Sequence, residues 1–102
     1  MRSVGKIELV QVADLQYAVA AGNYVELHLS QRMVLHRIPI SQFADRLNPG
    51  EFMRVHRSVI VRISQISSLE VAGDGVYHLT LACNSKVPVS ERYIAQVKQL
   101  LR

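Results

Sequence analysis

The most informative stretch of this chain is FMRVHRSVIVR, residues 52–62, in which apolar residues lie on both sides of a polar tripeptide at 56–58. Side chains on a strand alternate between its two faces, so one regular strand would put Arg57 on the same face as Val55 and Val59. Burying a guanidinium among valines costs free energy unless it has a partner. We therefore predict that the strand breaks at 56–58, with the polar tripeptide projecting from a rigid bend.

A rigidly held Arg57 beside His56 and Ser58 has the chemistry of a ligand for phosphate or for base edges in nucleic acids. The same residue could instead be buried in an ion pair with Asp45 or Glu51. The local sequence leaves both interpretations open.

Several short strands are predicted on the N-terminal side of this bend. Apolar runs and polar/apolar alternation place them over residues 7–12, 15–20, 24–30 and 33–38. Ala21-Gly22-Asn23 is a turn signal between the second and the third of these strands. The last two should pair antiparallel, and if their loop is the two residues Gln31-Arg32, Glu26 faces Arg37 across the pair.

Two helices are also predicted. Apolar residues at helical spacing over 43–47, followed by the stop signal Asn48-Pro49-Gly50, indicate a short internal helix. Ser90 is a favourable N-cap for a C-terminal helix whose apolar residues repeat at helical spacing over 94–101. Gly73-Asp74-Gly75 lies between two apolar runs and predicts a hairpin. The expected fold class is therefore mainly β, or α+β.

The chain has 102 residues, enough for one modest core, so residues 1–102 are interpreted as a single domain. A hydrophobic share of 49% with 20% charged residues is typical of globular proteins. The single cysteine, Cys83, excludes an internal disulfide framework and is compatible with a reducing cytoplasm. No apolar run has the length of a membrane span, so we expect a cytoplasmic protein outside the membrane.

Arginine dominates the net charge of +4, because it supplies nine of the twelve basic side chains. Residues 31–62 alone hold six arginines against two acidic side chains. A basic middle third is the footprint expected of a nucleic-acid-binding protein, since a guanidinium can bind phosphate or a guanine edge through two hydrogen bonds. A solvated basic face would give the same charge, so charge alone does not decide between the two.

Motifs of common enzyme classes are missing from the sequence, which has no Walker loop, GxGxxG, GxSxG, HExxH or CxxC. The histidines do not follow a metal-ligand spacing. Cys83 is better explained as a small packing residue than as a redox sensor beside Lys86. We expect no catalytic activity, no cofactor and no metal.

Two further segments could contact DNA. Arg92 lies in the first turn of the C-terminal helix, where a cation opposes the helix dipole, and with the backbone N–H groups after Ser90 it would form an anion site. Asn23 could read adenine, and Tyr24 could stack or contact phosphate. A surface arginine placed by chance and an ordinary turn would explain these residues equally well.

Taken in order, AGNYV at 21–25, FMRVHRSVIV at 52–61 and VSERY at 89–93 before a terminal helix resemble the LytTR DNA-binding domain family. The resemblance covers about residues 7–101. It implies an elongated fold of antiparallel β-sheets, with one short internal helix and a C-terminal helix, that inserts loops rather than a recognition helix into DNA grooves. It also implies a bacterial transcription regulator, most often the output domain of a two-component response regulator.

The resemblance carries over to individual positions of this chain. It implies base or near-base contacts for Asn23, Tyr24, Arg57 and Arg92. It implies phosphate contacts for Arg54, His56, Ser58, Lys86 and Ser90. Arg62 occupies a position where the family commonly has asparagine, and it would add a phosphate contact if it faces outward.

The partners implied by the resemblance are double-stranded DNA with direct repeats, which the domain is expected to bend, and a second copy of the domain on that DNA. A receiver or sensor domain would normally precede this one. The alternative from another class is a β-rich protein-interaction or small-ligand-binding module, in which the basic middle third is incidental.

Overall fold

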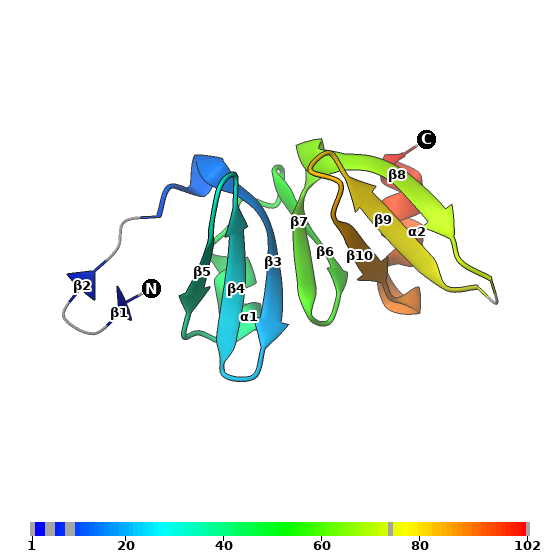
Figure 1. Ribbon diagram of the computed structural model, residues 1–102. Coiled ribbons are helices and arrows are strands. Elements are labelled where there is room, and N and C mark those ends of the chain that lie inside the picture. Colours follow the sequence, from blue (N-terminus) through cyan, green and yellow to red (C-terminus); the bar gives the residue numbers. More distant parts are fainter. Residues whose placement is uncertain (1, 4–5, 8–9, 74, 102) are drawn as a thin grey trace.

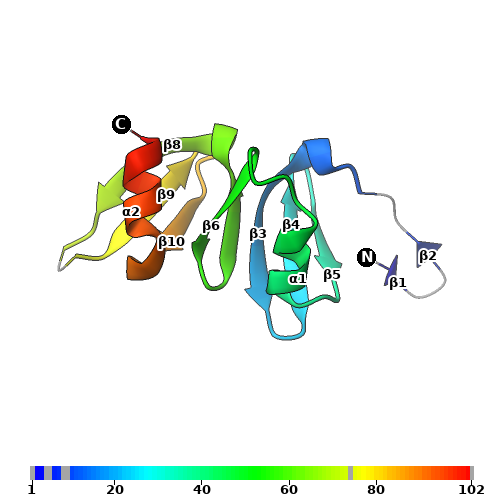
Figure 2. The same ribbon diagram turned by 180° about the vertical axis from the view of Figure 1, so that it is seen from behind.

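The computed structural model describes residues 2–3, 6–7, 10–73 and 75–101. The molecule is elongated, with extents of 47 × 23 × 22 Å, and two antiparallel sheets follow one another along its length (Figure 1). One helix packs behind each sheet (Figure 2). The expected fold, mainly β with a short internal helix and a C-terminal helix, is confirmed.

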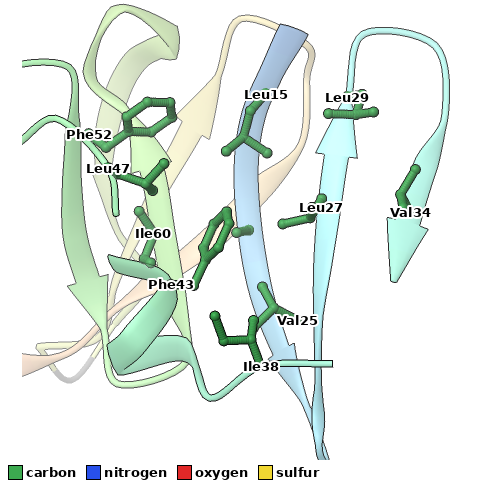
Figure 3. Close-up of a cluster of buried hydrophobic side chains, with 11 residues drawn as sticks. Leu15, Val25, Leu27, Leu29, Val34, Ile38, Phe43, Leu47, Phe52 and Ile60 are labelled. Atoms are coloured by element: carbon green, nitrogen blue, oxygen red, sulfur yellow. The ribbon is translucent and has the colours of Figure 1, made fainter. Parts of the chain in front are cut away.

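The larger sheet has five strands in the order β5-β4-β3-β7-β6. They are β3 (Leu15–Ala21), β4 (Tyr24–Leu29), β5 (Met33–His36), β6 (Phe52–His56) and β7 (Val59–Arg62). Helix α1 (Ile40–Asp45) covers one face of this sheet and inserts Phe43 between strand residues such as Leu27 and Ile60 (Figure 3). These side chains form the first hydrophobic core.

The smaller sheet has three strands in the order β10-β9-β8. They are β8 (Ile66–Val71), β9 (Tyr77–Leu81) and β10 (Lys86–Val89), and helix α2 (Glu91–Leu100) follows directly. Leu79 and Leu81 from β9 are buried with Val97 from α2 in a second hydrophobic core. This core lies between the smaller sheet, α2 and the edge of the larger sheet.

The β6–β7 hairpin belongs to both cores. Phe52 and Ile60 lie in the first core, whereas Val55, Val59 and Val61 lie in the second. The alternation of side chains along β7 therefore divides its apolar residues between two packing partners. The stretch with the most informative sequence is the part of the chain that joins the two halves of the molecule.

The remaining elements are short. They are the paired strands β1 (Arg2–Ser3) and β2 (Lys6–Ile7) and the 3₁₀ turns η1 (Val12–Asp14) and η2 (Ile63–Gln65). Of the helices in the described part of the chain, none combines the length and apolar character that crossing a membrane requires.

The predicted strand break at 56–58 is confirmed, because β6 ends at His56 and β7 begins at Val59. The predicted strand over 7–12 is wrong at its end, where Val12 begins a 3₁₀ turn, and residues 8–9 lie outside the described residues. The internal helix begins earlier than predicted, at Ile40 after the extended Pro39. The C-terminal helix after Ser90 is confirmed.

The predicted register of the β4–β5 hairpin is also wrong. Its loop is residues 30–31, closed by the hydrogen bond that the Leu29 N–H donates to the Arg32 carbonyl over 2.8 Å. Glu26 therefore pairs with Leu35 instead of Arg37. Neither loop residue is a glycine or asparagine, so the sequence holds no strong marker for the position of this turn.

Candidate nucleic-acid interface

Three connections lie along one edge of the molecule. They are the β3–β4 turn, the β6–β7 turn and the start of α2, all at the lower edge of Figure 1 and of the opposite view in Figure 2. Two backbone hydrogen bonds fix their spacing: the Ala20 N–H donates to the Ser58 carbonyl over 2.8 Å, and the Ser90 N–H donates to the Val55 carbonyl over 3.0 Å. The edge is a rigid row of connections.

The β6–β7 turn is held from inside by Arg54. The Arg54 Nε donates to the His56 carbonyl over 3.0 Å, and its Nη2 donates to the Arg57 carbonyl. The Ser58 N–H donates to His56 Nδ1 over 3.1 Å, so this nitrogen acts as an acceptor and carries no proton. A β-bulge between Arg54 and His56 accompanies these contacts.

Arg57 itself is exposed at the tip of this turn. The alternative of a buried Arg57 paired with Asp45 or Glu51 is therefore wrong, and the Glu51 carboxylate is 3.4 Å from Arg62 Nη1 instead. The backbone of the turn is bound by Arg54 and His56, while the Arg57 side chain extends outward. This is the arrangement of a pre-positioned ligand for an anion or a base edge.

Arg54, His56 and Ser58 were all expected to contact phosphate. The structure instead uses the Arg54 guanidinium and the His56 Nδ1 atom inside the turn, where they bind its backbone. Arg54 is therefore better described as a positioning residue. The half-buried side chains of His56 and Ser58 lie in the same turn as Arg57.

The β3–β4 turn brings two of the expected residues to the same edge. Gly22 has a φ of +61°, a conformation that favours glycine, and Asn23 follows it at the exposed tip. Tyr24 is 40% exposed, while the next residue, Val25, is completely buried. The tight turn therefore presents an amide and a phenol on a strand anchored in the first core.

The start of α2 contributes Ser90 and Arg92. Ser90 is the N-cap in extended conformation, and in the described structure its side chain makes no capping hydrogen bond. Its carbonyl accepts from the Tyr93 N–H over 2.9 Å. Arg92 is exposed, with its guanidinium carbon 5.8 Å from the centre of the Tyr93 ring. The helix N-terminus and an arginine therefore lie beside the β6–β7 turn.

Arg62 and Lys86 do not join this edge. Arg62 lies at the other end of β7, where its Nε donates to the Leu15 carbonyl over 2.7 Å and its Nη2 to the Val12 carbonyl over 2.5 Å. It also lies 4.5 Å from the centre of the Phe52 ring and is only 16% exposed. Arg62 ties η1 and β3 to the hairpin, so the conditional expectation of an outward phosphate contact is not met.

Lys86 begins β10, at the end of that strand opposite α2. Its Nζ lies 3.7 Å from Glu70 Oε1 on β8, in a pair exposed to solvent. Its expected role as a phosphate contact finds no support in this position.

Arg37 also lies near this edge, although no motif in the sequence singles it out. Arg37 is exposed in the connection between β5 and α1, which reaches the lower edge of the larger sheet (Figure 1). The only signal in the sequence was the cluster of arginines in residues 31–62.

Comparison with known proteins identifies the family. The profile of the LytTr DNA-binding domain matches residues 5–102. The sensory transduction protein LytT of Bacillus anthracis is 31% identical over 96 residues, which cover 94% of this chain and 39% of that protein. The transcriptional regulatory protein YpdB of Escherichia coli K12 is 27% identical over 97 residues, which cover 94% of this chain and 40% of YpdB.

The fold also matches a solved structure. The LytTr DNA-binding domain of a protein from Bacillus cereus superposes with a TM-score of 0.80 and 24% sequence identity, over 90% of this chain and 84% of that one. This chain spans about 40% of the length of LytT and YpdB. Since the family profile covers nearly the whole sequence, this chain belongs to the LytTR DNA-binding domain family.

Proposed function

We propose that this domain binds duplex DNA sequence-specifically through the edge formed by the β3–β4 turn, the β6–β7 turn and the start of α2. The observation that supports this most is a pair of backbone hydrogen bonds, from the Ala20 N–H to the Ser58 carbonyl and from the Ser90 N–H to the Val55 carbonyl, that holds three exposed connections in one row. The family is a DNA-binding module without catalytic activity, in agreement with the missing enzyme motifs.

The spacing of the row suits a short stretch of DNA. Neighbouring strands are about 4.8 Å apart, so the centres of the β3–β4 and β6–β7 turns lie two spacings, or about 10 Å, from each other. This is the rise of about three base pairs of B-DNA. Asn23 and Arg57 can therefore contact bases within one short site.

Each exposed side chain has a role that follows from its chemistry. Arg57 and Arg92 bind guanine edges or the phosphates beside them, and Asn23 binds adenine. Tyr24 contacts phosphate or stacks. The N–H groups at the start of α2, together with the Ser90 hydroxyl, bind a phosphate. Arg54 supports this interface from within by holding the turn.

The whole protein is proposed to be a bacterial transcription regulator acting in the cytoplasm. LytT is named a sensory transduction protein and YpdB a transcriptional regulatory protein, and each is more than twice as long as this chain. By analogy, this domain is the output part of a two-component response regulator, joined to a receiver or sensor domain. Two copies would bind direct repeats cooperatively.

The test is to select duplexes from a random pool with the domain and to measure affinity by fluorescence anisotropy over a range of salt concentrations. Each neutralised phosphate should contribute about −0.9 to the slope of log affinity against log salt. Arg57→Ala should weaken the selected duplex more than a scrambled one, by about 1–3 kcal/mol if the contact is bidentate. Absence of duplex binding at low salt, or a flat salt response, would instead favour the protein-interaction or small-ligand module.

A further inference from the structure

We propose that Arg37 is a further DNA contact, which binds a backbone phosphate about half a helical turn away from the base pairs that Arg57 reads. The inference rests on the proposed DNA-binding function and extends the interface to the outer strand of the larger sheet. Arg37 belongs to none of the three segments that resemble the family's motifs.

The register of the larger sheet places Arg37 at the edge. Val25 and His36 are the last residues that pair between β4 and β5. Arg37 follows His36, and Tyr24, the first residue of β4, precedes Val25, so Arg37 lies next to the start of β4. Arg37 therefore flanks the turn that presents Asn23 and Tyr24. The connection that contains it turns back at the same edge before α1 (Figure 1).

The backbone on both sides of Arg37 is anchored in the first core. The His36 ring packs edge-on against Phe43, with ring centres 6.3 Å apart, and burial lowers the pKa of His36. Ile38 is only 6% exposed. Between these two inward-facing residues, Arg37 is exposed. Its guanidinium therefore extends from a fixed point, and little backbone freedom is lost when it binds a ligand.

Among the described residues, no acidic side chain is paired with the Arg37 guanidinium. The shifted register pairs Glu26 with Leu35, and the Glu26 carboxylate interacts with His28 Nε2 over 3.1 Å. Within the residues that the structure describes, Arg37 makes no hydrogen bond or ion pair. With respect to these described residues, it can bind phosphate without first breaking a hydrogen bond or an ion pair.

The distance along the edge sets which phosphate it meets. From β5 to the centre of the β6–β7 turn there are three and a half strand spacings, or about 17 Å. This corresponds to about five base pairs, half a turn of B-DNA. Arg37 is too far from the bases contacted by Arg57 to share them, and its contact should be to the backbone.

The experiment compares the wild-type domain with Arg37→Ala on a selected and on a scrambled duplex over a range of salt concentrations. Loss of one phosphate contact should reduce the salt slope by about 0.9, which is about eightfold in affinity at 0.1 M salt. The loss should be equal on both duplexes and should shrink toward high salt. Arg37→Lys should retain most of the affinity, because lysine also binds phosphate as a point charge.

Arg32→Ala is the matched control, because it removes the same charge from the opposite end of β5 and should leave the slope unchanged. Ethylation interference on the selected duplex should lose, in Arg37→Ala, the phosphates about five base pairs from the Arg57 contact. An unchanged melting temperature would show that the variant is folded.

The outcomes separate this inference from the proposed function. If wild-type domain binds no duplex DNA, the proposed function fails first. If wild type binds but Arg37→Ala keeps its affinity and slope, the Arg37 contact is refuted alone. Equal losses in Arg37→Ala and Arg32→Ala would indicate a long-range charge effect, and a loss confined to the selected duplex would indicate a base contact. Either result would overturn the proposal.

Discussion

Arg54→Ala removes both guanidinium hydrogen bonds that hold the β6–β7 turn, those to the carbonyls of His56 and Arg57. A hydrogen bond with a charged partner contributes about 1.5–3 kcal/mol, and the partial exposure of Arg54 reduces this to about 1 kcal/mol each. The free energy of unfolding should therefore fall by about 2 kcal/mol. For a domain of this size the melting temperature should drop by roughly 8–15 °C.

The same change should reduce DNA affinity through Arg57. Without Arg54, residues 57 and 58 must be ordered on binding, and fixing the backbone of one residue costs about 1–2 kcal/mol. The loss in DNA-binding free energy should therefore be at most about 2–4 kcal/mol. It should be larger for the selected duplex than for the scrambled one, because Arg57 is expected to read bases. A phosphate contact by Arg54, the role implied by resemblance alone, would weaken all duplexes equally.

Circular dichroism melting and fluorescence anisotropy with selected and scrambled duplexes measure the two effects. Arg54→Lys is the matched variant, because it keeps the charge but cannot form both hydrogen bonds of the guanidinium fork. If Arg54 holds the turn, the lysine variant should behave like the alanine variant. A wild-type melting temperature, combined with equal losses on both duplexes that lysine restores, would refute the reasoning.

Three further variants test other parts of the structure. Gly22→Ala should lower stability by about 1–2 kcal/mol in thermal unfolding, because φ is +61° and no neighbouring atom offers compensating contact; an unchanged melting temperature would contradict this. Arg62→Ala should lower the free energy of unfolding by roughly 2–4 kcal/mol while the salt slope of DNA binding stays unchanged. A reduced slope would instead indicate that Arg62 contacts DNA. Burial lowers the pKa of His36 in the folded state. The contribution of the neutral ring to the free energy of unfolding is therefore complete above the pKa of the unfolded chain, about 6.5, and is lost as the pH falls toward the pKa of the folded state. In denaturant unfolding, the free energy of unfolding of His36→Gln should therefore decline less below pH 6.5 than that of the wild type. Parallel pH profiles of the two proteins would rule this out.

The sequence was a good guide where a side chain conflicts with the regular pattern. Arg57 among valines predicts the strand break, because burying an unpaired guanidinium is costly. Gly22 likewise marks the β3–β4 turn through its positive φ, and Ser90 marks the start of α2, although its side chain makes no capping hydrogen bond in the described structure. These three signals correspond to the three connections of the edge.

The sequence could not separate arginines that bind phosphate from arginines that bind backbone. Arg54 and Arg62 donate to carbonyl groups, which every residue has, so their partners leave no trace in the amino-acid sequence. The position of Arg37 depended on a hairpin register that its loop residues do not specify. Long-range pairing, rather than local propensity, decided these three assignments.

Because the β6–β7 hairpin supplies side chains to both cores, the two sheets cannot tilt against each other without disturbing the turn that carries Arg57. We expect the two sheets with their helices to behave as one rigid body that melts in a single step. If the edge of this rigid domain binds along a DNA duplex, the more easily deformed partner should change shape. We expect the curvature in the complex to be taken up by the duplex, at flexible pyrimidine–purine steps between the contacts.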